Sequence, residues 1–314
     1  DEVNATYENF TEDIVAFQQI AKNWADVNPA DIVGMRAPYL KTEGDERFSK
    51  HLDVARIDYC TFGNSNPFRI RIVNKFNDNY DHYYIKIADA SRIYGLELEH
   101  ILSPKRITYI TYKNSLIEEH IPGIPGDVFI NNYLHEPSTN KIRLAKEFVK
   151  FNERCFVRLL GDMRSYNFVL EVMPDIEDFQ YRIRAIDFDQ QSYEGKKKLY
   201  LPQFFKENLP LVEMALSLLN KDSINQYQME ERTLIAFRLS SSRYRMMHLL
   251  NIMSNDVIST PEKTNQLKHE LADYFQNNQF IKCNSMGQVV KMHLKQTLRK
   301  SLANIKQMLE KNHD

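Results

Sequence analysis

Residues 160–167 read LGDMRSYN, and residues 186–189 read IDFD. Within them, Asp162 is followed five positions later by Asn167, and Asp187 lies twenty residues beyond Asn167. Carboxylate and amide oxygens are hard ligands of the kind that Mg²⁺ requires. An aspartate beside such ligands can also accept a proton from a reacting hydroxyl. The two stretches therefore predict a site that combines a base with metal-binding oxygens.

The surroundings of these stretches predict a mainly helical region with one β-hairpin. Two strand-like runs at 168–172 and 181–186 lie between the stretches and predict the hairpin. Helical spacing of apolar residues predicts helices at 141–158, 209–219, 230–253, 261–277 and 287–311. The hairpin would then hold the two acidic stretches at its ends.

The part of the chain before residue 120 has a different pattern. Short β-type runs occur at 56–61, 68–73, 83–87, 106–112 and 115–120, with helical patterns at 7–24 and 91–102. The run IPGIPG at 121–126 interrupts regular structure before the helical region begins. We therefore predict an α+β fold with two lobes. The N-terminal lobe at 1–120 has an N-terminal helix followed by an antiparallel sheet with one helix, and the helical C-terminal lobe at 121–314 carries the loop of Asp162.

Composition narrows the class of partner. Forty-one basic and forty-two acidic side chains give a net charge of −1, so no nucleic-acid partner is expected. Cys60, Cys155 and Cys283 are widely spaced and form no CxxC pair, which favours a reducing compartment over disulfides or a zinc site. No run of 18 apolar residues is present, so we expect no transmembrane segment and a cytoplasmic protein.

Gly161-Asp162 with Asn167, followed by Ile186-Asp187-Phe188, resembles the catalytic loop and metal-binding motif of the protein-kinase-like superfamily. The form is closest to aminoglycoside and choline kinases and to lipid kinases, where a Gly precedes the catalytic Asp. The resemblance implies ATP and Mg²⁺ as cofactors, Asp162 as the base, and Asn167 and Asp187 as magnesium ligands. It also implies that Arg164, two residues after Asp162, meets the transferring phosphate.

The resemblance extends over residues 55–205 and supplies candidate nucleotide contacts. Residues 83–86, YYIK, resemble the third-strand motif whose Lys contacts phosphates, which assigns that role to Lys86. Glu97 or Glu99 of the following helix would be its ion-pair partner. Glu97 is favoured because it shares a helix face with Tyr94 and Ile101.

Two further segments complete the nucleotide site that the resemblance implies. Gly63, Asn64 and Ser65 lie in a turn that would cover the phosphates. Glu118 and His120 lie in a stretch similar to the inter-lobe hinge, whose backbone would meet the adenine. The turn has one Gly instead of the Gly-x-Gly-x-x-Gly spacing, and no Ala-Pro-Glu follows residue 189, which argues against a protein kinase in particular.

The resemblance implies a Mg²⁺- and ATP-dependent phosphotransferase that moves the γ-phosphoryl group to a hydroxyl of a small-molecule acceptor. Alternatives are a lipid or protein acceptor, transfer of an adenylyl group, and an inactive kinase-like module that binds nucleotide or a partner. Leu160 stands where many relatives have a His before Gly-Asp, and this replacement is compatible with the hypothesis of an inactive module. Asp189 stands where protein kinases have Gly, and we expect it to be a helix N-cap in preference to a second metal ligand.

Overall fold

The structure is a computed structural model that describes residues 52–60, 67–87, 89–112, 115–175 and 179–311. The chain divides into two compact units, which we call the sheet unit (Asp1–Ala88 and Ile107–His120) and the helical unit (Asp89–Arg106 and Ile121–Asp314). The fold is α+β, as predicted, with a small antiparallel sheet and a mostly helical remainder. The helix expected at 7–24 lies outside the described residues.

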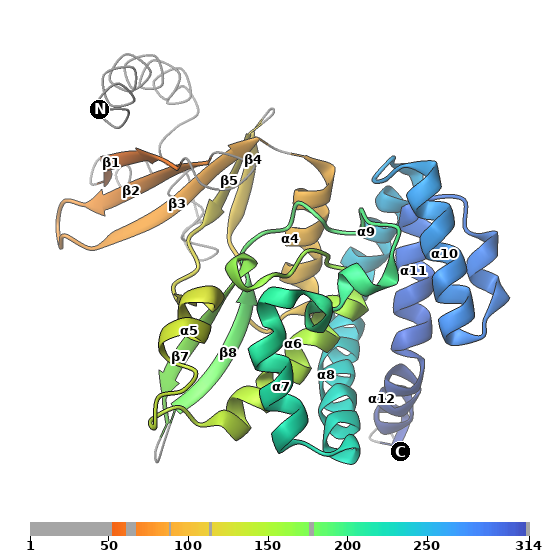
Figure 1. Cartoon of the computed structure of the whole chain (residues 1–314). Helices are drawn as coiled ribbons and strands as arrows, with labels where there is room; N and C mark the ends of the chain where they lie inside the picture. Colours follow the sequence, from red (N-terminus) through yellow and green to blue (C-terminus); the bar gives the residue numbers. More distant parts are fainter. Residues whose placement is uncertain (1–51, 61–66, 88, 113–114, 176–178, 312–314) are drawn as a thin grey trace. The chain divides into compact units, whose positions relative to one another are not determined.

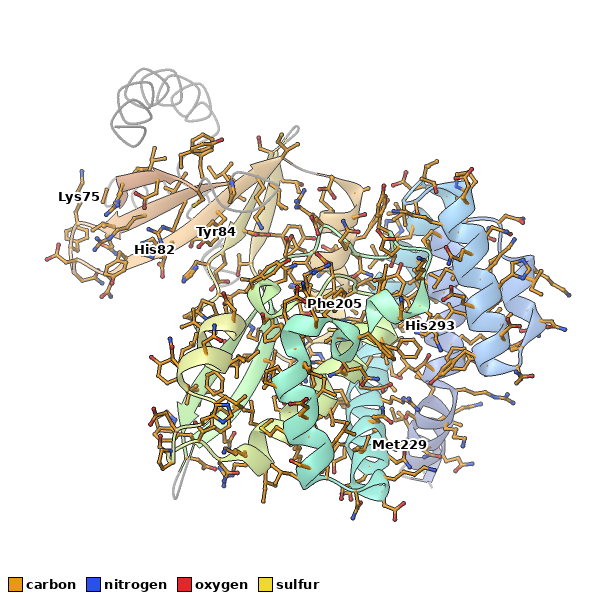
Figure 2. All side chains as sticks on the ribbon, in the orientation of Figure 1. Lys75, His82, Tyr84, Phe205, Met229 and His293 are labelled. Carbon is orange, nitrogen blue, oxygen red and sulfur yellow. The ribbon has the colours of Figure 1, made fainter. Side chains whose placement is uncertain are left out.

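The sheet unit contains a five-stranded antiparallel sheet in the order β1-β2-β3-β5-β4. Its strands are β1 (Leu52–Tyr59), β2 (Phe68–Asn74), β3 (Tyr80–Ile87), β4 (Tyr109–Tyr112) and β5 (Ser115–Glu119). Alternation of side chains along β3 sends Tyr83 and Ile85 into an apolar cluster on one face. His82, Tyr84 and Lys86 therefore share the opposite face, and His82 and Tyr84 can be followed along β3 (Figure 2).

The helical unit consists mainly of helices and also contains a second, three-stranded sheet, which lies beside α5 and α6 (Figure 1). Its helices are α4 (Ala90–Leu102), α5 (Gly126–Asn132), α6 (Lys141–Arg158), α7 (Leu209–Leu218), α8 (Lys221–Ser241), α9 (Arg243–Asn255), α10 (Pro261–Phe275), α11 (Met286–Thr297) and α12 (Arg299–Lys311). The sheet has the order β6-β7-β8, with β6 (Ile124–Pro125), β7 (Phe168–Pro174) and β8 (Phe179–Ala185). None of the helices in the described ranges is long and apolar enough to cross a membrane.

Two of the long predicted helices are broken. The helix expected at 230–253 is replaced by α8 and α9, which meet at Ser242, the last of three consecutive serines. Serine side chains compete for backbone hydrogen bonds and so weaken a helix interior. The helix expected at 287–311 divides into α11 and α12 at Leu298, which is fully buried. Apolar periodicity continues across that second break, which is why the pattern alone predicts one helix.

Helix α4 groups with the helical unit, whereas the sequence pattern placed it in the N-terminal lobe at 1–120. The reason is its apolar face: Tyr94, Leu98 and Ile101 belong to the same buried cluster as Phe156 of α6. The Glu99 carboxylate of α4 also forms a buried ion pair with Arg158 at the end of α6. Packing and charge therefore both fix α4 on the helices that follow it in the chain.

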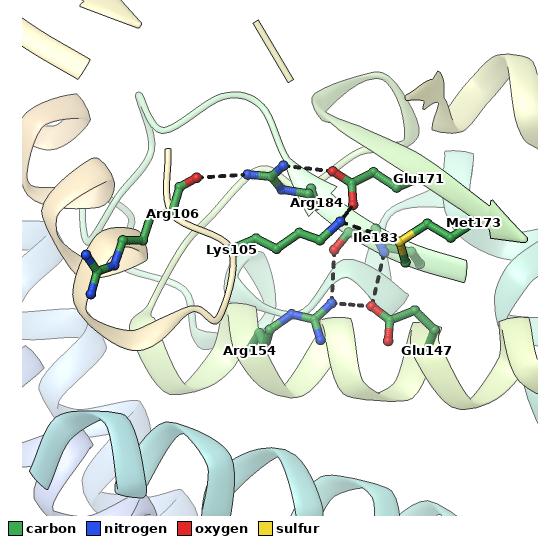
Figure 3. Close-up of polar contacts among 8 residues, drawn as sticks. All are labelled: Lys105, Arg106, Glu147, Arg154, Glu171, Met173, Ile183 and Arg184. Atoms are coloured by element: carbon green, nitrogen blue, oxygen red, sulfur yellow. Dashed lines mark hydrogen bonds and ion pairs between the residues drawn. The ribbon is translucent and has the colours of Figure 1, made fainter. Parts of the chain in front are cut away.

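A buried charged pair attaches the β7–β8 hairpin to α6 (Figure 3). The Arg154 guanidinium donates to the Glu147 carboxylate at 2.6 Å and to the Ile183 carbonyl at 3.0 Å. The same Glu147 oxygen accepts the Ile183 N–H at 3.0 Å. Arg184 donates to Glu171 at 2.7 Å on the neighbouring part of the hairpin. The strands that join the two acidic motifs are thus held on the helix that precedes both of them.

The buried His293 of α11, labelled in Figure 2, predicts a loss of stability in acid. Its Nε2 lies 2.8 Å from the Phe156 carbonyl oxygen, and its Nδ1 is buried with no hydrogen-bond partner among the described residues. Desolvation lowers the pKa of His293 from 6.5 to about 4. The pKa of His293 is lower in the folded state than in the unfolded state. The contribution of neutral His293 to the free energy of unfolding is therefore complete above pH 6.5 and is lost as the pH falls toward 4.

We expect this histidine alone to reduce the free energy of unfolding by about 3 kcal/mol between pH 7.5 and pH 4. Urea unfolding of wild type and His293→Leu at both pH values measures the effect. The variant should lose less stability on acidification than the wild type does. Equal losses in the two proteins would show that His293 is not the acid-sensitive group.

Candidate active site

The loop that carries Asp162 is positioned by its own backbone. Helix α6 ends at Leu159, whose left-handed conformation (φ 54°) turns the chain out of the helix. The Gly161 N–H donates to the Gln190 carbonyl at 3.2 Å, and the Asp162 N–H donates to the Leu199 carbonyl at 3.2 Å. A Cβ at Gly161 would lie 3.0 Å from the Gln190 oxygen, which explains the glycine before Asp162. Asp162 itself has a positive φ of 54°.

The structure brings three of the predicted site residues into direct contact. Asn167 donates through Nδ2 to the Asp162 carbonyl at 2.7 Å and to its carboxylate Oδ2 at 3.3 Å. Arg164 donates through Nε to the Asp162 Oδ1 at 2.8 Å. The Asn167 carbonyl accepts the Ile186 N–H at 3.0 Å, which places Asp187 directly after a residue bonded to the loop. The two stretches that the sequence singled out therefore form one constellation.

The segment at 186–189 is anchored by Phe188, which is buried. A Cβ at Gly95 of α4 would lie 2.8 Å from the Phe188 Cβ, so only glycine allows the helix to approach the motif this closely. The Asp187 Oδ1 accepts the Asp189 N–H at 3.3 Å. Asp189 begins a turn and no helix starts there, so the expectation that it is a helix N-cap is wrong. The chain folds back at this turn toward the loop of Asp162.

Negative charge at this motif is incompletely compensated. Burial, followed by the charge of Asp187, raises the pKa of Asp189 to about 6, and the charges of Asp162 and Asp89 act in the same direction. Arg92 opposes the shift, and its guanidinium lies 3.7 Å from the Asp189 carboxylate. A bound cation would relieve this excess of negative charge.

The donor atoms of the motif suit magnesium. Asp187, Asp189 and Asn167 supply hard carboxylate and amide oxygens. Within the described ranges, no group of three or more His, Cys, Asp or Glu side chains could hold a metal ion by itself. Mg²⁺ is commonly held by one or two carboxylates together with water and substrate phosphates, so a two-ligand protein site fits it.

The Asp162 carboxylate and the neighbouring Arg164 guanidinium are both accessible. The side chains of Asp162 and Arg164 are 36% and 35% exposed. Arg164 also donates to the Glu207 carboxylate at 2.8 Å, and its guanidinium lies 5.1 Å from the Phe205 ring centroid. Phe205 is labelled in Figure 2. Hydrogen bonding to Asp162 raises the pKa of Arg164, so this side chain is a permanent cation beside the base.

The predicted nucleotide contacts that lie in the sheet unit are partly described. Lys86 on β3 forms an ion pair with Glu118 on β5, and the two side chains are 9% and 7% exposed. The His120 N–H donates to the His82 carbonyl at 2.9 Å. The chain crosses between the two units at three places, after Ala88, after Arg106 and after His120. The hinge role of Glu118 and His120 stays a prediction. Gly63, Asn64 and Ser65 lie outside the described residues.

The two candidate glutamates of α4 both have arginine partners in the helical unit. Glu97 pairs with Arg245 of α9 through contacts of 2.8 Å, and Glu99 pairs with Arg158. The ion pair of Lys86 with Glu97 stays a prediction. The structure thus adds Glu118 to the candidate partners of Lys86, on a strand where the sequence pattern predicted an adenine contact.

Two buried amides support the site and were not singled out by the sequence. Gln191 donates through Nε2 to the carbonyls of Arg158 at 2.6 Å and Leu159 at 3.2 Å, which ties the segment after Asp187 to the start of the loop that carries Asp162. Asn208 donates to the Met163 carbonyl at 2.9 Å. Single Gln and Asn residues in loops carry no spacing signal, so only their burial in the folded chain reveals them.

Comparisons with known proteins found similarity to solved structures but no match to a protein family or a curated sequence. No protein-family model matches the sequence. No curated protein sequence matches it. Among solved structures, the crystal structure of the proinflammatory kinase CtkA of Helicobacter pylori is similar at 12% sequence identity and a TM-score of 0.39. That match covers 79% of this chain and 95% of the CtkA chain.

Proposed function

We propose that the protein is a Mg²⁺- and ATP-dependent phosphotransferase that moves the γ-phosphoryl group to a hydroxyl of a small-molecule acceptor. The observation that carries this proposal is the constellation of Asp162, Arg164, Asn167 and Asp187 on adjoining segments of the helical unit. Phosphoryl transfer depends on positioning and electrostatic stabilisation, and needs little covalent chemistry from the protein. The transfer needs a base for the acceptor proton, a cation near the phosphates and oxygen ligands for the metal ion.

Each side chain has a separate task in this proposal. The accessible Asp162 carboxylate orients the acceptor hydroxyl and takes its proton. Arg164, held between Asp162 and Glu207, faces the charge of the transferring group. Asn167 and Asp187 would hold Mg²⁺, which when bound supplies neutralisation of the phosphate charge. Lys86 stays the candidate contact for the nucleotide phosphates, as the sequence resemblance implies.

The reaction balances in atoms and charge. A bond forms between the acceptor oxygen and the γ-phosphorus, and the bond from the γ-phosphorus to the bridging oxygen of ADP breaks. The acceptor proton passes to Asp162 and then to solvent. Gly161 before the base and the missing Ala-Pro-Glu motif support a small-molecule acceptor over a protein. Lipid and protein acceptors and adenylyl transfer are outcomes that the following test distinguishes.

Thermal unfolding with MgATP, with ATP plus chelator, and in buffer alone tests the nucleotide site. At a ligand concentration a hundredfold above Kd we expect MgATP to stabilise the fold by about 2.7 kcal/mol, with a smaller effect when the metal is removed. Acceptors are then screened in three arms: hydroxylated small molecules, anionic vesicles and a generic protein. Product mass separates a phosphoryl from an adenylyl group. Wild type without any nucleotide effect would contradict the proposal and favour a binding module.

A further inference from the structure

Lys86, Glu97 and Glu99, the three residues considered for the ion pair of the phosphate-binding lysine, each form an ion pair within their own unit. Within the sheet unit, Lys86 pairs with Glu118. Within the helical unit, Glu97 pairs with Arg245 and Glu99 pairs with Arg158. The acid that contacts the proposed phosphate-binding lysine is thus on a neighbouring strand, and each glutamate of α4 contacts an arginine of its own unit.

We propose that Glu118 is the positioning residue that holds the Lys86 ammonium for the nucleotide phosphates, and that α4 is a fixed part of the helical unit. This inference rests on the proposed function, because it assigns Lys86 a phosphate to contact. It differs from the arrangement that the sequence resemblance implies, in which a glutamate of α4 fills this position. The acid would then be built into the same sheet as the lysine.

Strand register makes the pair of Lys86 and Glu118 intrinsic to the sheet. Strands β3 and β5 lie side by side in the sheet (Figure 1). They are antiparallel, and their register places Tyr84 opposite Glu118 and Lys86 opposite Leu116. Residues two apart on a strand point to the same face, so Lys86 and Glu118 are diagonal neighbours on one face of the sheet. A buried ammonium requires such a partner, because an unpaired charge in this environment is costly. The register of the sheet therefore places an acid where it can orient the Lys86 side chain.

Helix α4 is held in the helical unit by contacts that oppose its release. The ion pair of Glu99 with Arg158 is buried, so separating the helix would leave unpaired buried charges. The Tyr94 hydroxyl contacts the Asp256 carboxylate at 2.5 Å. Gly95 packs against Phe188 of the metal-binding motif. These contacts give α4 the role of supporting the motif of Asp187, which is separate from holding the lysine.

A double-mutant cycle on the full chain tests this assignment. We compare wild type, Lys86→Met, Glu118→Gln and the double variant, and measure the Kd for MgATP by calorimetry. Glu118→Gln should weaken binding about tenfold or more, as expected for loss of a charged hydrogen bond. In the Lys86→Met background the same change should have little further effect, because Glu118 acts through the lysine. Glu118→Asp, which keeps the charge, should retain more affinity than Glu118→Gln.

Two further variants distinguish this inference from its rivals. Glu119→Gln is the matched control on the same strand, since Glu119 is exposed and accepts the Thr108 N–H at 3.2 Å. Glu97→Gln examines the alternative partner. Loss of MgATP affinity in Glu97→Gln, with wild-type affinity in Glu118→Gln, overturns the inference. If Glu118→Gln does not fold, the double variant decides: its folding supports a role of Glu118 through Lys86, and its failure to fold overturns the inference, because Glu118 would then be needed without the lysine.

A readout without nucleotide separates this inference from the proposed function. The same four proteins are unfolded in urea in the absence of ATP. If the pair exists, the double variant loses less stability than the sum of the two single losses. Wild type that binds no MgATP overturns the proposed function and the phosphate-directed role of Glu118. Coupling in urea would still establish the ion pair, whereas purely additive losses in urea overturn the pairing itself.

Discussion

Asp162→Asn is expected to lower kcat by about 10²- to 10⁴-fold, the range associated with loss of general base catalysis. An asparagine Oδ1 can still accept the hydrogen bond that Arg164 donates at 2.8 Å, and Asn167 can still donate to the carbonyl of residue 162 at 2.7 Å. The loop should therefore keep its geometry, although the 3.3 Å contact of Asn167 with Oδ2 is lost. The amide cannot take the acceptor proton at neutral pH. Steady-state kinetics with an identified acceptor measure kcat, and calorimetry measures the Kd for MgATP, which should be nearly unchanged.

The control for this substitution is Asp222→Asn, which makes the same chemical change at an exposed position in the first turn of α8. Its kcat should equal that of wild type. An Asp162→Asn protein with full activity would contradict the role of the base. Loss of MgATP affinity in Asp162→Asn would instead indicate that this carboxylate contributes to metal or nucleotide binding.

Local patterns predicted elements in both units, including the helix that leads into the loop of Asp162. The alternation of Tyr83 and Ile85 with polar neighbours predicted strand β3, and apolar spacing predicted α6 with both bounds as observed. The spacing of Asp162, Asn167 and Asp187 indicated one site, and the structure joins the two stretches through Asn167. These features depend on residues close in sequence, whose periodicity and hydrogen bonding are readable from the chain itself.

Ion pairs and hydrogen bonds between residues distant in sequence could not be predicted from local patterns. Arg164 meets Glu207 across forty-three positions, and Glu97 meets Arg245 across 148. The strand register that joins Lys86 to Glu118 and the packing that places α4 in the helical unit likewise follow from tertiary structure. Helix spacing correctly placed Glu97 on one face with Tyr94, but a helix face does not specify which unit covers it.

Asp187→Asn is expected to remove most of the Mg²⁺-dependent stabilisation by ATP, which should reach about 2.7 kcal/mol in wild type at a hundredfold excess over Kd. The substitution removes a negative charge from the proposed metal site. The amide oxygen can still accept the Asp189 N–H, which lies 3.3 Å from Oδ1 in the wild type, so the turn should persist. Thermal unfolding in MgATP and in ATP plus chelator measures the effect.

The two nucleotide conditions make the interpretation specific to the metal. If Asp187 is a magnesium ligand, the variant in MgATP should behave like wild type in ATP plus chelator, because each lacks the bridge between protein and phosphates. Asp273→Asn, at an exposed position of α10, controls for the loss of one carboxylate. A MgATP shift of wild-type size in Asp187→Asn would exclude Asp187 as a ligand. Because Phe188 is buried against Gly95, an unchanged melting temperature without nucleotide would show that the motif stays packed while its metal affinity is lost.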